Sequence, residues 1–259
     1  PGIPQGLEAS LFEKRLKLSA LRINSRDCAR VLKCSKLAPA VFRHRGVRNV
    51  VEDPSGDAGK RLILLGEGFR PDGSEELLST DVWKLVQAEV DSGRAEFAEQ
   101  EVLLGYEHLS SEEALAKVLP PGSEVPSSFE TIGQIAHFNL REVLLPYKEL
   151  IGRIVLDKNK GLRTVINKVG SLNNEFRTFE MEVLAGAANF HTTVREEGMS
   201  FELDYSEVYW NSRLGQERQR VLKQLESGQI VVDMFAGIGA MSCFAATAGC
   251  RVLSNDLNP

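Results

Sequence analysis

The segment that most restricts what this chain can fold into is formed by its last 32 residues, 228–259, which read GQIVVDMFAGIGAMSCFAATAGCRVLSNDLNP. An apolar strand at 230–233 leads to two glycines, Gly237 and Gly239, and a helix is expected from about Ala240, followed by a second apolar strand. This order of strand, glycine turn, helix and strand is typical of the start of a Rossmann-type sheet that binds a nucleotide. We therefore expect the first part of an α/β domain here.

The residues around the loop indicate which nucleotide fits. Glycines 237 and 239 allow positive φ and close approach of a ligand, and the helix N-terminus offers free N–H groups. Asp256, 17 residues after Gly239, suits the two ribose hydroxyls of an adenosine. Ser242 stands where a dinucleotide fingerprint needs its third glycine, while Asp233 suits a positively charged group such as an ammonium. We predict S-adenosylmethionine as the cofactor. The predicted cofactor-binding residues are Asp233, Phe235, Gly237, Gly239 and Asp256.

Length and composition narrow the class of protein. The chain has 259 residues, of which 42% are hydrophobic, enough for one large or two to three modest domains. It contains no uninterrupted apolar stretch of about 20 residues, so we expect no membrane span, and its start, PGIPQGLEAS, has no signal-peptide pattern. Its four cysteines have no CxxC spacing, and we expect no metal site. Because it lacks an initial Met and stops directly after a strand, we expect a C-terminally truncated fragment. Alone, this fragment is expected to show little or no methyl transfer.

Charge is segregated along the chain although the net charge is only -5. Residues 1–60 carry 12 Lys and Arg against 6 Asp and Glu, whereas residues 61–130 carry 5 against 15. A basic N-terminal unit is able to meet nucleic-acid phosphates, although such blocks are equally often plain solvated faces.

The hydrophobic patterns predict a small N-terminal α/β domain, an α+β middle domain and an incomplete Rossmann-type domain, with boundaries at 1–120, 121–204 and 205–259. Pro120-Pro121-Gly122 marks the first boundary. In the first part we expect an alternating strand at 17–23, a helix from Asn24 or Ser25, two strands joined by a polar turn within 48–68, a helix at 80–90 and acidic helical sequence up to Leu119. In the middle part we expect β-rich runs at 131–140, 150–159 and 162–171, and a helix at 141–155 that overlaps the second run. Strands at 177–186 and 200–210 and a helix at 211–225 follow.

Four stretches of the second half resemble one family. They are GQIAHFNLREVLLPYKELIGRIVLDKN (133–159), NEFRTFEMEVLAG (174–186), YWNSRLGQER (209–218), and DMFAGIGAM with NDLNP (233–241 and 255–259). In combination they are similar to the eukaryotic and archaeal tRNA guanine-37 N1-methyltransferases, class I enzymes that use S-adenosylmethionine. The resemblance implies a domain at 1–120 that contacts the corner of the tRNA, followed by a middle domain and a methyltransferase domain.

The chemistry of this family requires groups that these motifs supply. Guanine N1 carries a proton at neutral pH, so a base must remove it, and the resemblance makes Glu217 the general base. Arg177 matches the family's cation near O6, where it would stabilise developing negative charge. Arg213 and Arg218 flank Glu217 and are expected to bind phosphate or to hold the carboxylate ionised, and Tyr209 matches an aromatic residue that lines the substrate site.

Other interpretations remain open. Without the resemblance, Glu217 with Arg213 is more simply an ordinary surface pair on a helix. A relative in wybutosine synthesis transfers the aminocarboxypropyl group of the same cofactor to tRNA, and a non-catalytic tRNA-binding protein would use the basic residues 1–60. A dehydrogenase fits the loop least well. The resemblance further implies a monomer located in the cytoplasm, nucleus and mitochondrial matrix, with tRNA as its partner.

Overall fold

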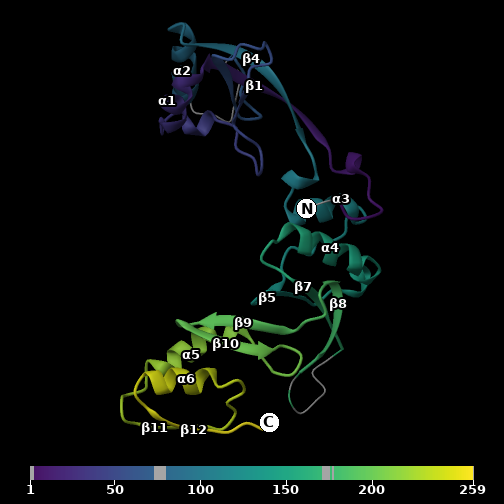
Figure 1. The fold of residues 1–259 in the computed structure, drawn as a ribbon, viewed down its shortest axis with the longest axis vertical. Helices are drawn as coiled ribbons and strands as arrows, with labels where there is room; N and C mark the ends of the chain where they lie inside the picture. Colours follow the sequence, from purple (N-terminus) through teal and green to yellow (C-terminus); the bar gives the residue numbers. More distant parts are fainter. Residues whose placement is uncertain (1–2, 73–79, 171–175, 177, 259) are drawn as a thin grey trace. The chain divides into compact units, whose positions relative to one another are not determined.

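The structure is a computed structural model that describes residues 3–72, 80–170, 176 and 178–258. The chain divides into two compact units, 1–117 and 118–259, so the predicted boundary near Pro120 lies close to the observed division (Figure 1). The predicted separation of a middle domain from a third domain at residue 205 stays a prediction. Within the described ranges, none of the helices is long and apolar enough to cross a membrane.

The first unit is built on an antiparallel sheet of four strands with the order β2-β3-β1-β4 in its described part. The strands are β1 (Lys14–Asn24), β2 (Val50–Glu52), β3 (Lys60–Leu64) and β4 (Ala95–Leu104). The helices of this unit are η1 (Ala9–Leu11), η2 (Ser25–Asp27), α1 (Cys28–Lys33), η3 (Ala38–Ala40), α2 (Thr80–Asp91), η4 (Tyr106–His108) and α3 (Ser111–Val118), which reaches the border. The predicted paired strands within 48–68 and the predicted helix at 80–90 are confirmed.

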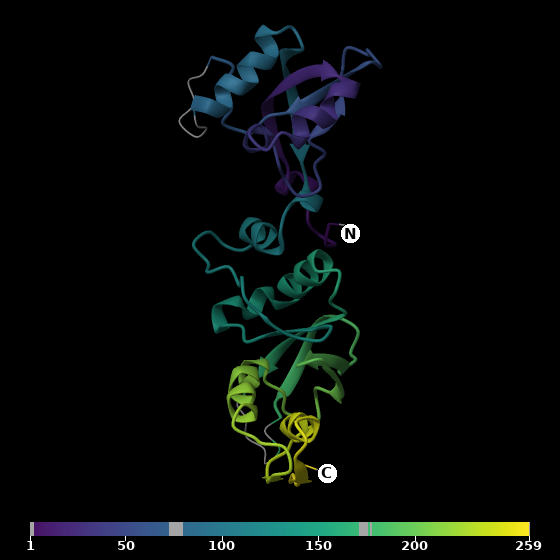
Figure 2. The same ribbon diagram turned by 90° about the vertical axis from the view of Figure 1, so that its left-hand side faces the viewer.

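Both faces of this sheet are covered, because apolar residues alternate along β1. Leu21 and Ile23 share one face of the sheet, where they form a core with Val31 of α1 and Val86 of α2. The two helices lie against the sheet in Figure 2. Leu18 belongs to a second cluster on the opposite face, together with Phe42 and Leu64. Strand β1 is thus the central buried element of the unit.

The prediction of helical sequence up to Leu119 is wrong in its first half. Residues 95–104 form strand β4, which pairs with β1 along nearly its whole length, and helix is confined to η4 and α3. Glu, Ala and Gln favour helix intrinsically, but long-range pairing overrides that preference. The acidic residues of β4 face basic residues of β1: Arg15 contacts Glu101 at 2.9 Å and Lys17 contacts Glu99 at 2.7 Å.

This pairing also explains the charge segregation in the sequence. The first unit as a whole carries 17 Lys and Arg against 19 Asp and Glu in residues 1–117. Part of the basic charge of residues 1–60 is therefore paired with acidic residues of the same sheet. The basic loop Arg43, His44, Arg45 and Arg48 lies outside the strands.

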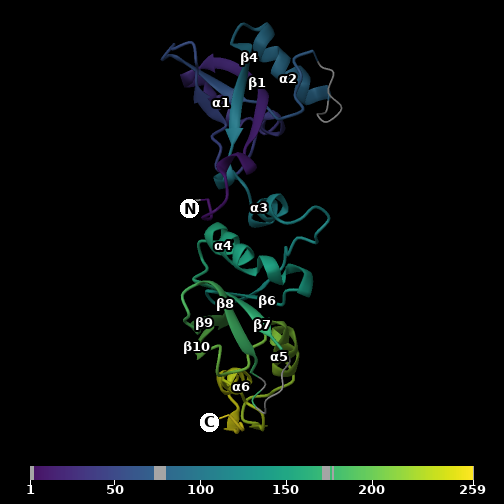
Figure 3. The same cartoon turned by 90° about the vertical axis from the view of Figure 1, so that its right-hand side faces the viewer.

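The second unit begins with a sheet of order β5-β6-β7-β8 in its described part. The bounds are β5 (Glu130–Ile132), β6 (Ile135–Phe138), β7 (Thr164–Val169) and β8 (Glu180–Gly186). Strands β6 and β7 are parallel and are connected through η5 (Glu142–Tyr147) and α4 (Lys148–Lys158), which covers one face of the sheet (Figure 3). Gly152 lets α4 approach β8 closely, because a Cβ there would lie 2.6 Å from the Cβ of Leu184.

Residues 150–159 were predicted both as a β-rich run and as the end of a helix, and the helix is observed. Ile151, Ile154, Val155 and Lys158 are all buried, and their spacing of three and four residues places them on one helical face. The β-branched residues alone suggested a strand, but the spacing is that of α4.

The opposite face of the sheet carries the rest of the unit. Strands β9 (His191–Glu196) and β10 (Met199–Asp204) form a hairpin, of which β9 was not predicted. The predicted helix at 211–225 is shorter, consisting of η6 (Ser212–Leu214) and α5 (Gly215–Leu222). The strand–helix–strand segment at the end is confirmed as β11 (Ile230–Asp233), α6 (Ala240–Thr247) and β12 (Arg251–Ser254), with the two strands parallel.

One apolar cluster joins these pieces. Ile135 and Ile166 of the sheet pack with Phe201 of the hairpin, Trp210 before η6 and Phe244 of α6. Helix α5 packs against α6. The hairpin, the two helices and the sheet are therefore held in one core.

Candidate functional site

The glycine loop has the backbone that the sequence predicts. Gly237 and Gly239 have φ values of 54° and 80°, and, apart from the glycine itself and its two chain neighbours, no described atom lies within 4 Å of a Cβ built at either position. The space above the loop is therefore open. The Gly237 N–H donates to Asp256 Oδ2 at 2.6 Å and the Asn258 N–H to Asp256 Oδ1 at 2.9 Å. These backbone hydrogen bonds lower the pKa of Asp256, so its carboxylate is charged beside the loop.

Ser242 replaces a glycine with a structural contact. Its hydroxyl donates to Asp233 Oδ2 at 2.6 Å and accepts from the Ser254 hydroxyl at 2.8 Å. Ser242 is buried, so these two hydrogen bonds connect the end of β11 to the end of β12 through α6. The predicted acidic residue of the first strand is thereby fixed in orientation, and the loop differs from one that accommodates a pyrophosphate.

The loop and the strands that flank it expose apolar side chains. Phe235 is 87% exposed, and Ile230, Val232 and Leu253 on the β11–β12 pair are 60–64% exposed. The Asn258 side-chain amide donates to the Glu207 carbonyl oxygen at 2.8 Å, which brings the end of the chain to the segment before Tyr209. The predicted cofactor residues and the start of the predicted substrate segment are thus neighbours.

Glu217 lies on α5 with its side chain 56% exposed. Arg220, one turn further on, donates to both carboxylate oxygens at 2.8 and 2.6 Å. These hydrogen bonds lower the pKa of Glu217. The expectation that Arg213 or Arg218 holds the carboxylate ionised is therefore wrong, because Arg220 does so. Arg220 was not predicted as a partner, although its i, i+3 spacing from Glu217 is a signal that could have indicated it.

Tyr209 and Arg213 lie on the approach to α5. The Tyr209 hydroxyl accepts a hydrogen bond from the Asn211 amide at 3.1 Å, and the ring is 37% exposed. Asn211 caps η6 by accepting from the Arg213 N–H at 2.9 Å. The Arg213 residue is exposed and so remains accessible to a substrate.

Arg218 has a different environment from the one predicted. It forms a two-pronged ion pair with Glu196 at the end of β9, with contacts of 2.7 and 2.6 Å, and lies over the Trp210 ring. Glu196 is 22 residues away in sequence, and no local pattern indicated it. Arg177, the predicted cation near O6, lies outside the described residues, and its role stays a prediction.

His137 is a further polar group that the sequence did not assign to the site. Its Nδ1 lies 3.1 Å from the Tyr205 hydroxyl, and its ring stacks on Phe179. Burial lowers the pKa of His137 and raises that of Tyr205, so both are neutral near pH 7. The pair connects β6 with the segment after β10.

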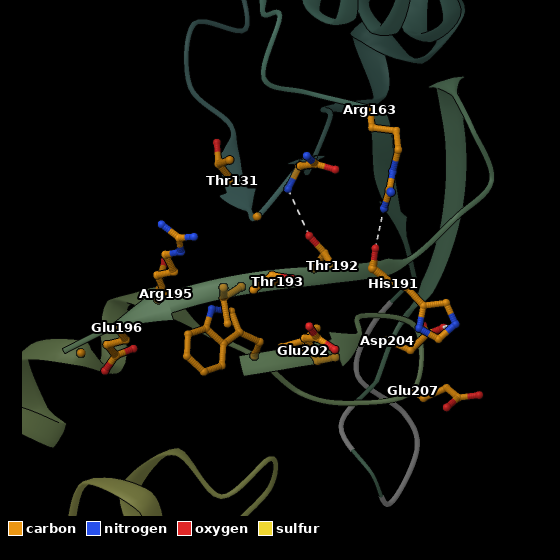
Figure 4. A pocket seen from close by; sticks show the side chains of 17 residues that line it. Thr131, Arg163, His191, Thr192, Thr193, Arg195, Glu196, Glu202, Asp204 and Glu207 are labelled. Atoms are coloured by element: carbon orange, nitrogen blue, oxygen red, sulfur yellow. Dashed lines mark hydrogen bonds and ion pairs between the residues drawn. The ribbon is translucent and has the colours of Figure 1, made fainter. Parts of the chain in front are cut away.

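A groove runs between the β5–β6 turn and the hairpin (Figure 4). Arg163 enters it and donates to the His191 carbonyl oxygen at 2.5 Å, while the Thr192 hydroxyl accepts from the Gln134 N–H at 3.1 Å. The groove carries charges of both signs. Its wall includes Glu196, the carboxylate that pairs with Arg218.

Two models of known protein families match the second half of the chain. Residues 111–189 match the family model described as the TYW2 N-terminal domain, and residues 192–259 match the TRM5/TYW2 methyltransferase domain. The second half of the chain belongs to the TRM5/TYW2 family. The family resemblance inferred from the four sequence stretches is confirmed.

Three curated relatives carry the name tRNA (guanine(37)-N(1))-methyltransferase. The protein from Phytophthora infestans is 38% identical, that from Homo sapiens 37% and that from Danio rerio 39%, each over 98% of this chain. The chain spans 61%, 48% and 53% of these relatives, respectively.

Two solved structures show the same fold. Wild-type Trm5b from Pyrococcus abyssi superposes with a TM-score of 0.65 and 26% identity, covering 93% of this chain and 64% of that one. The complex of aTrm5 with tRNALeu gives a TM-score of 0.62 at 21% identity, covering 93% and 67%. The predicted fold class, α/β with a Rossmann-type methyltransferase start, is confirmed.

Proposed function

We propose that this chain is part of an S-adenosylmethionine-dependent enzyme that methylates N1 of guanine 37 in tRNA. The observation that carries the proposal is that one unit holds both an ionised Glu217 on α5 and an open glycine loop beside Asp256, with α5 packed on α6. The names of the relatives support the same reaction.

The loop residues fit the cofactor. Open space above Gly237 and Gly239 accepts a flat adenosine, and the Asp256 carboxylate retains lone pairs for ribose hydroxyls beside its two backbone hydrogen bonds. Asp233 is oriented by Ser242 toward a cationic group, and exposed Phe235 offers an apolar surface. When bound, S-adenosylmethionine supplies an electrophilic methyl group.

Glu217 supplies the base for this reaction. Guanine N1 forms the new bond to the methyl carbon as the carbon–sulfur bond breaks, and the N1 proton passes to the Glu217 carboxylate. Arg220 keeps that carboxylate ionised before the reaction. Tyr209 and Arg213 would line the substrate path, and Arg177 would stabilise charge on O6.

The test compares Glu217→Gln with Glu226→Gln, a matched change at an exposed residue after α5. Both are made in a protein that carries this chain within a complete methyltransferase domain, and labelled methyl transfer to tRNA with G37 or A37 is measured. We expect Glu217→Gln to lower kcat by roughly 10²–10⁴-fold, as for loss of a general base, and Glu226→Gln to leave it unchanged. Equal activity of both variants would overturn the assignment.

A second candidate is aminocarboxypropyl transfer from the same cofactor. It is favoured by the match of residues 111–189 to the TYW2 N-terminal domain. Mass spectrometry of the modified nucleoside separates the two reactions, because the transferred groups differ in mass. A protein that only binds tRNA would give neither product, and its binding would not change in Glu217→Ala.

We further propose that the first unit binds tRNA through the basic loop at Arg43, Arg45 and Arg48, and that the protein is a monomer of the cytoplasm, nucleus and mitochondrial matrix. The loop lies outside the charge-matched β1–β4 pair, which supports its role. Replacing the three arginines with Gln should weaken tRNA binding and reduce its salt dependence. Sedimentation and cell fractionation test the other two statements.

A further inference from the structure

Arg218 and Glu196 form a desolvated ion pair that no step of the proposed reaction uses. The Arg218 Nε and Nη2 donate to the two Glu196 oxygens at 2.7 and 2.6 Å, and their side chains are only 14% and 13% exposed. Nη2 also contacts the Asn211 carbonyl oxygen at 3.3 Å. The guanidinium carbon lies 4.9 Å from the centre of the Trp210 ring. The Nε and Nη2 donors of Arg218 are thus directed to protein atoms.

The pair connects the elements that carry the two halves of the site. Glu196 ends β9, and Trp210 contacts Phe201 of β10 with ring centres 6.1 Å apart. Phe201 in turn meets Phe244 of α6, the helix that follows the glycine loop, at 5.8 Å. Arg218 therefore attaches α5 to the same hairpin that supports the cofactor helix.

Apart from its packing on α6, helix α5 has few contacts that fix its orientation. None of its eight residues, all of which the structure describes, is buried, and its apolar contact to the core is made by partly buried Leu222. A forked, charge-assisted contact has a defined geometry, which a single apolar side chain does not supply. Successive helical residues point about 100° apart, so fixing Arg218 also fixes the direction of Glu217.

We propose that Arg218 and Glu196 are positioning residues, which hold α5 against the β9–β10 hairpin so that Glu217 faces the guanine. This inference rests on the proposed role of Glu217 as the base. It assigns Arg218 a role inside the protein in place of the two roles expected from the sequence, binding phosphate or holding the Glu217 carboxylate ionised.

The experiment uses Glu196→Gln and Arg218→Gln, with Glu202→Gln as the matched control on the same hairpin. Glu202 pairs across strands with Thr193 and is exposed on the other face. Hydrogen exchange of the α5 amides is measured in the chain itself. Kinetics and tRNA binding at several salt concentrations are measured in a protein with a complete methyltransferase domain.

We expect both variants of the pair to speed α5 exchange about tenfold or more, as for loss of a charge-assisted hydrogen bond, while Glu202→Gln does not. We also expect kcat to fall ~10–100-fold with unchanged KM for tRNA, because a misplaced base slows chemistry without weakening binding. The double variant should be no worse than either single one. If Glu196→Gln does not fold, Arg218→Lys keeps the charge without the fork and is expected to show the same two changes.

The opposite pattern overturns the proposal. If Arg218→Gln raises KM and lowers the salt slope of tRNA binding by about one phosphate contact while Glu196→Gln behaves like the control, Arg218 binds the tRNA backbone. If the unmodified protein transfers no methyl group to G37, the proposed function fails, whereas the exchange of α5 still decides whether the pair holds the helix.

Discussion

Glu89 in the first unit allows a quantitative prediction of how stability depends on pH. Its side chain is 9% exposed, Arg30 contacts both oxygens at 2.9 and 2.7 Å, and Arg94 adds a contact of 3.0 Å. These hydrogen bonds, Arg30 first, lower the pKa of Glu89 from 4.5 to about 2. At about 1.4 kcal/mol per pKa unit, and allowing for the half-exposed arginines, the carboxylate contributes about 2–3 kcal/mol of folding stability.

Because the folded-state pKa is lowered, this contribution is complete above the unfolded value near 4.5 and is lost as pH falls to about 2. Glu89→Gln should therefore be about 2–3 kcal/mol less stable than the original chain at pH 7, and this difference should shrink toward zero at pH 2. Denaturant titrations followed through the Trp83 indole signal measure it, because Trp83 packs in the core of this unit.

The control is Glu67→Gln, which removes a pair with Lys14 whose partners are 49% and 57% exposed. Such a surface pair contributes less than about 1 kcal/mol. A difference between Glu89→Gln and the original chain that stays constant from pH 7 to pH 2 would refute the reasoning, since it would show that the charge of Glu89 is not what stabilises the fold.

Three further substitutions test other parts of the molecule. Gly152→Ala should destabilise the second unit by about 1–3 kcal/mol in thermal melts, since its Cβ would meet β8, whereas Gly161→Ala has open space and should cost less than about 1 kcal/mol. Gly239→Ala, at φ 80°, should weaken S-adenosylmethionine binding in calorimetry more than it lowers the melting temperature; the reverse order would contradict a ligand role for the loop. Arg220→Gln should raise the pKa of Glu217 toward its ordinary value and move the acidic limb of the kcat profile to higher pH, and an unmoved limb would show that Glu217 is not the titrating base.

Local patterns were sufficient to predict the glycine loop. Gly237, Gly239 and Asp256 lie within 20 residues of each other, and each expected feature depends on neighbours along the chain. The helix at 80–90 and the paired strands within 48–68 were predictable for the same reason. Where a structural element is determined by contacts between residues close in sequence, the pattern of residues along the chain is sufficient to predict it.

Features set by distant contacts were not predictable in this way. Residues 95–104 have helical composition and become a strand only because β1 pairs with them. The partner of Arg218 is Glu196 on a strand that was not expected, so a partly buried residue was interpreted as a ligand of phosphate or of the Glu217 carboxylate. For Glu217 the partner was local, but three arginines stood within four residues of it, and only side-chain geometry distinguishes Arg220.

The pairing of β1 with β4 also determines when the first unit can form during synthesis. Lys14 is opposite Leu104, so the central strand emerges from the ribosome long before its neighbour exists. In that interval the apolar residues Leu16 and Leu18 are separated and flanked by Lys14, Arg15 and Lys17, charges of the kind that keep a waiting strand from aggregating. Arg15 and Lys17 later meet the acids of β4, while Lys14 meets Glu67, and so the same charges protect the nascent chain before they pair in the folded unit.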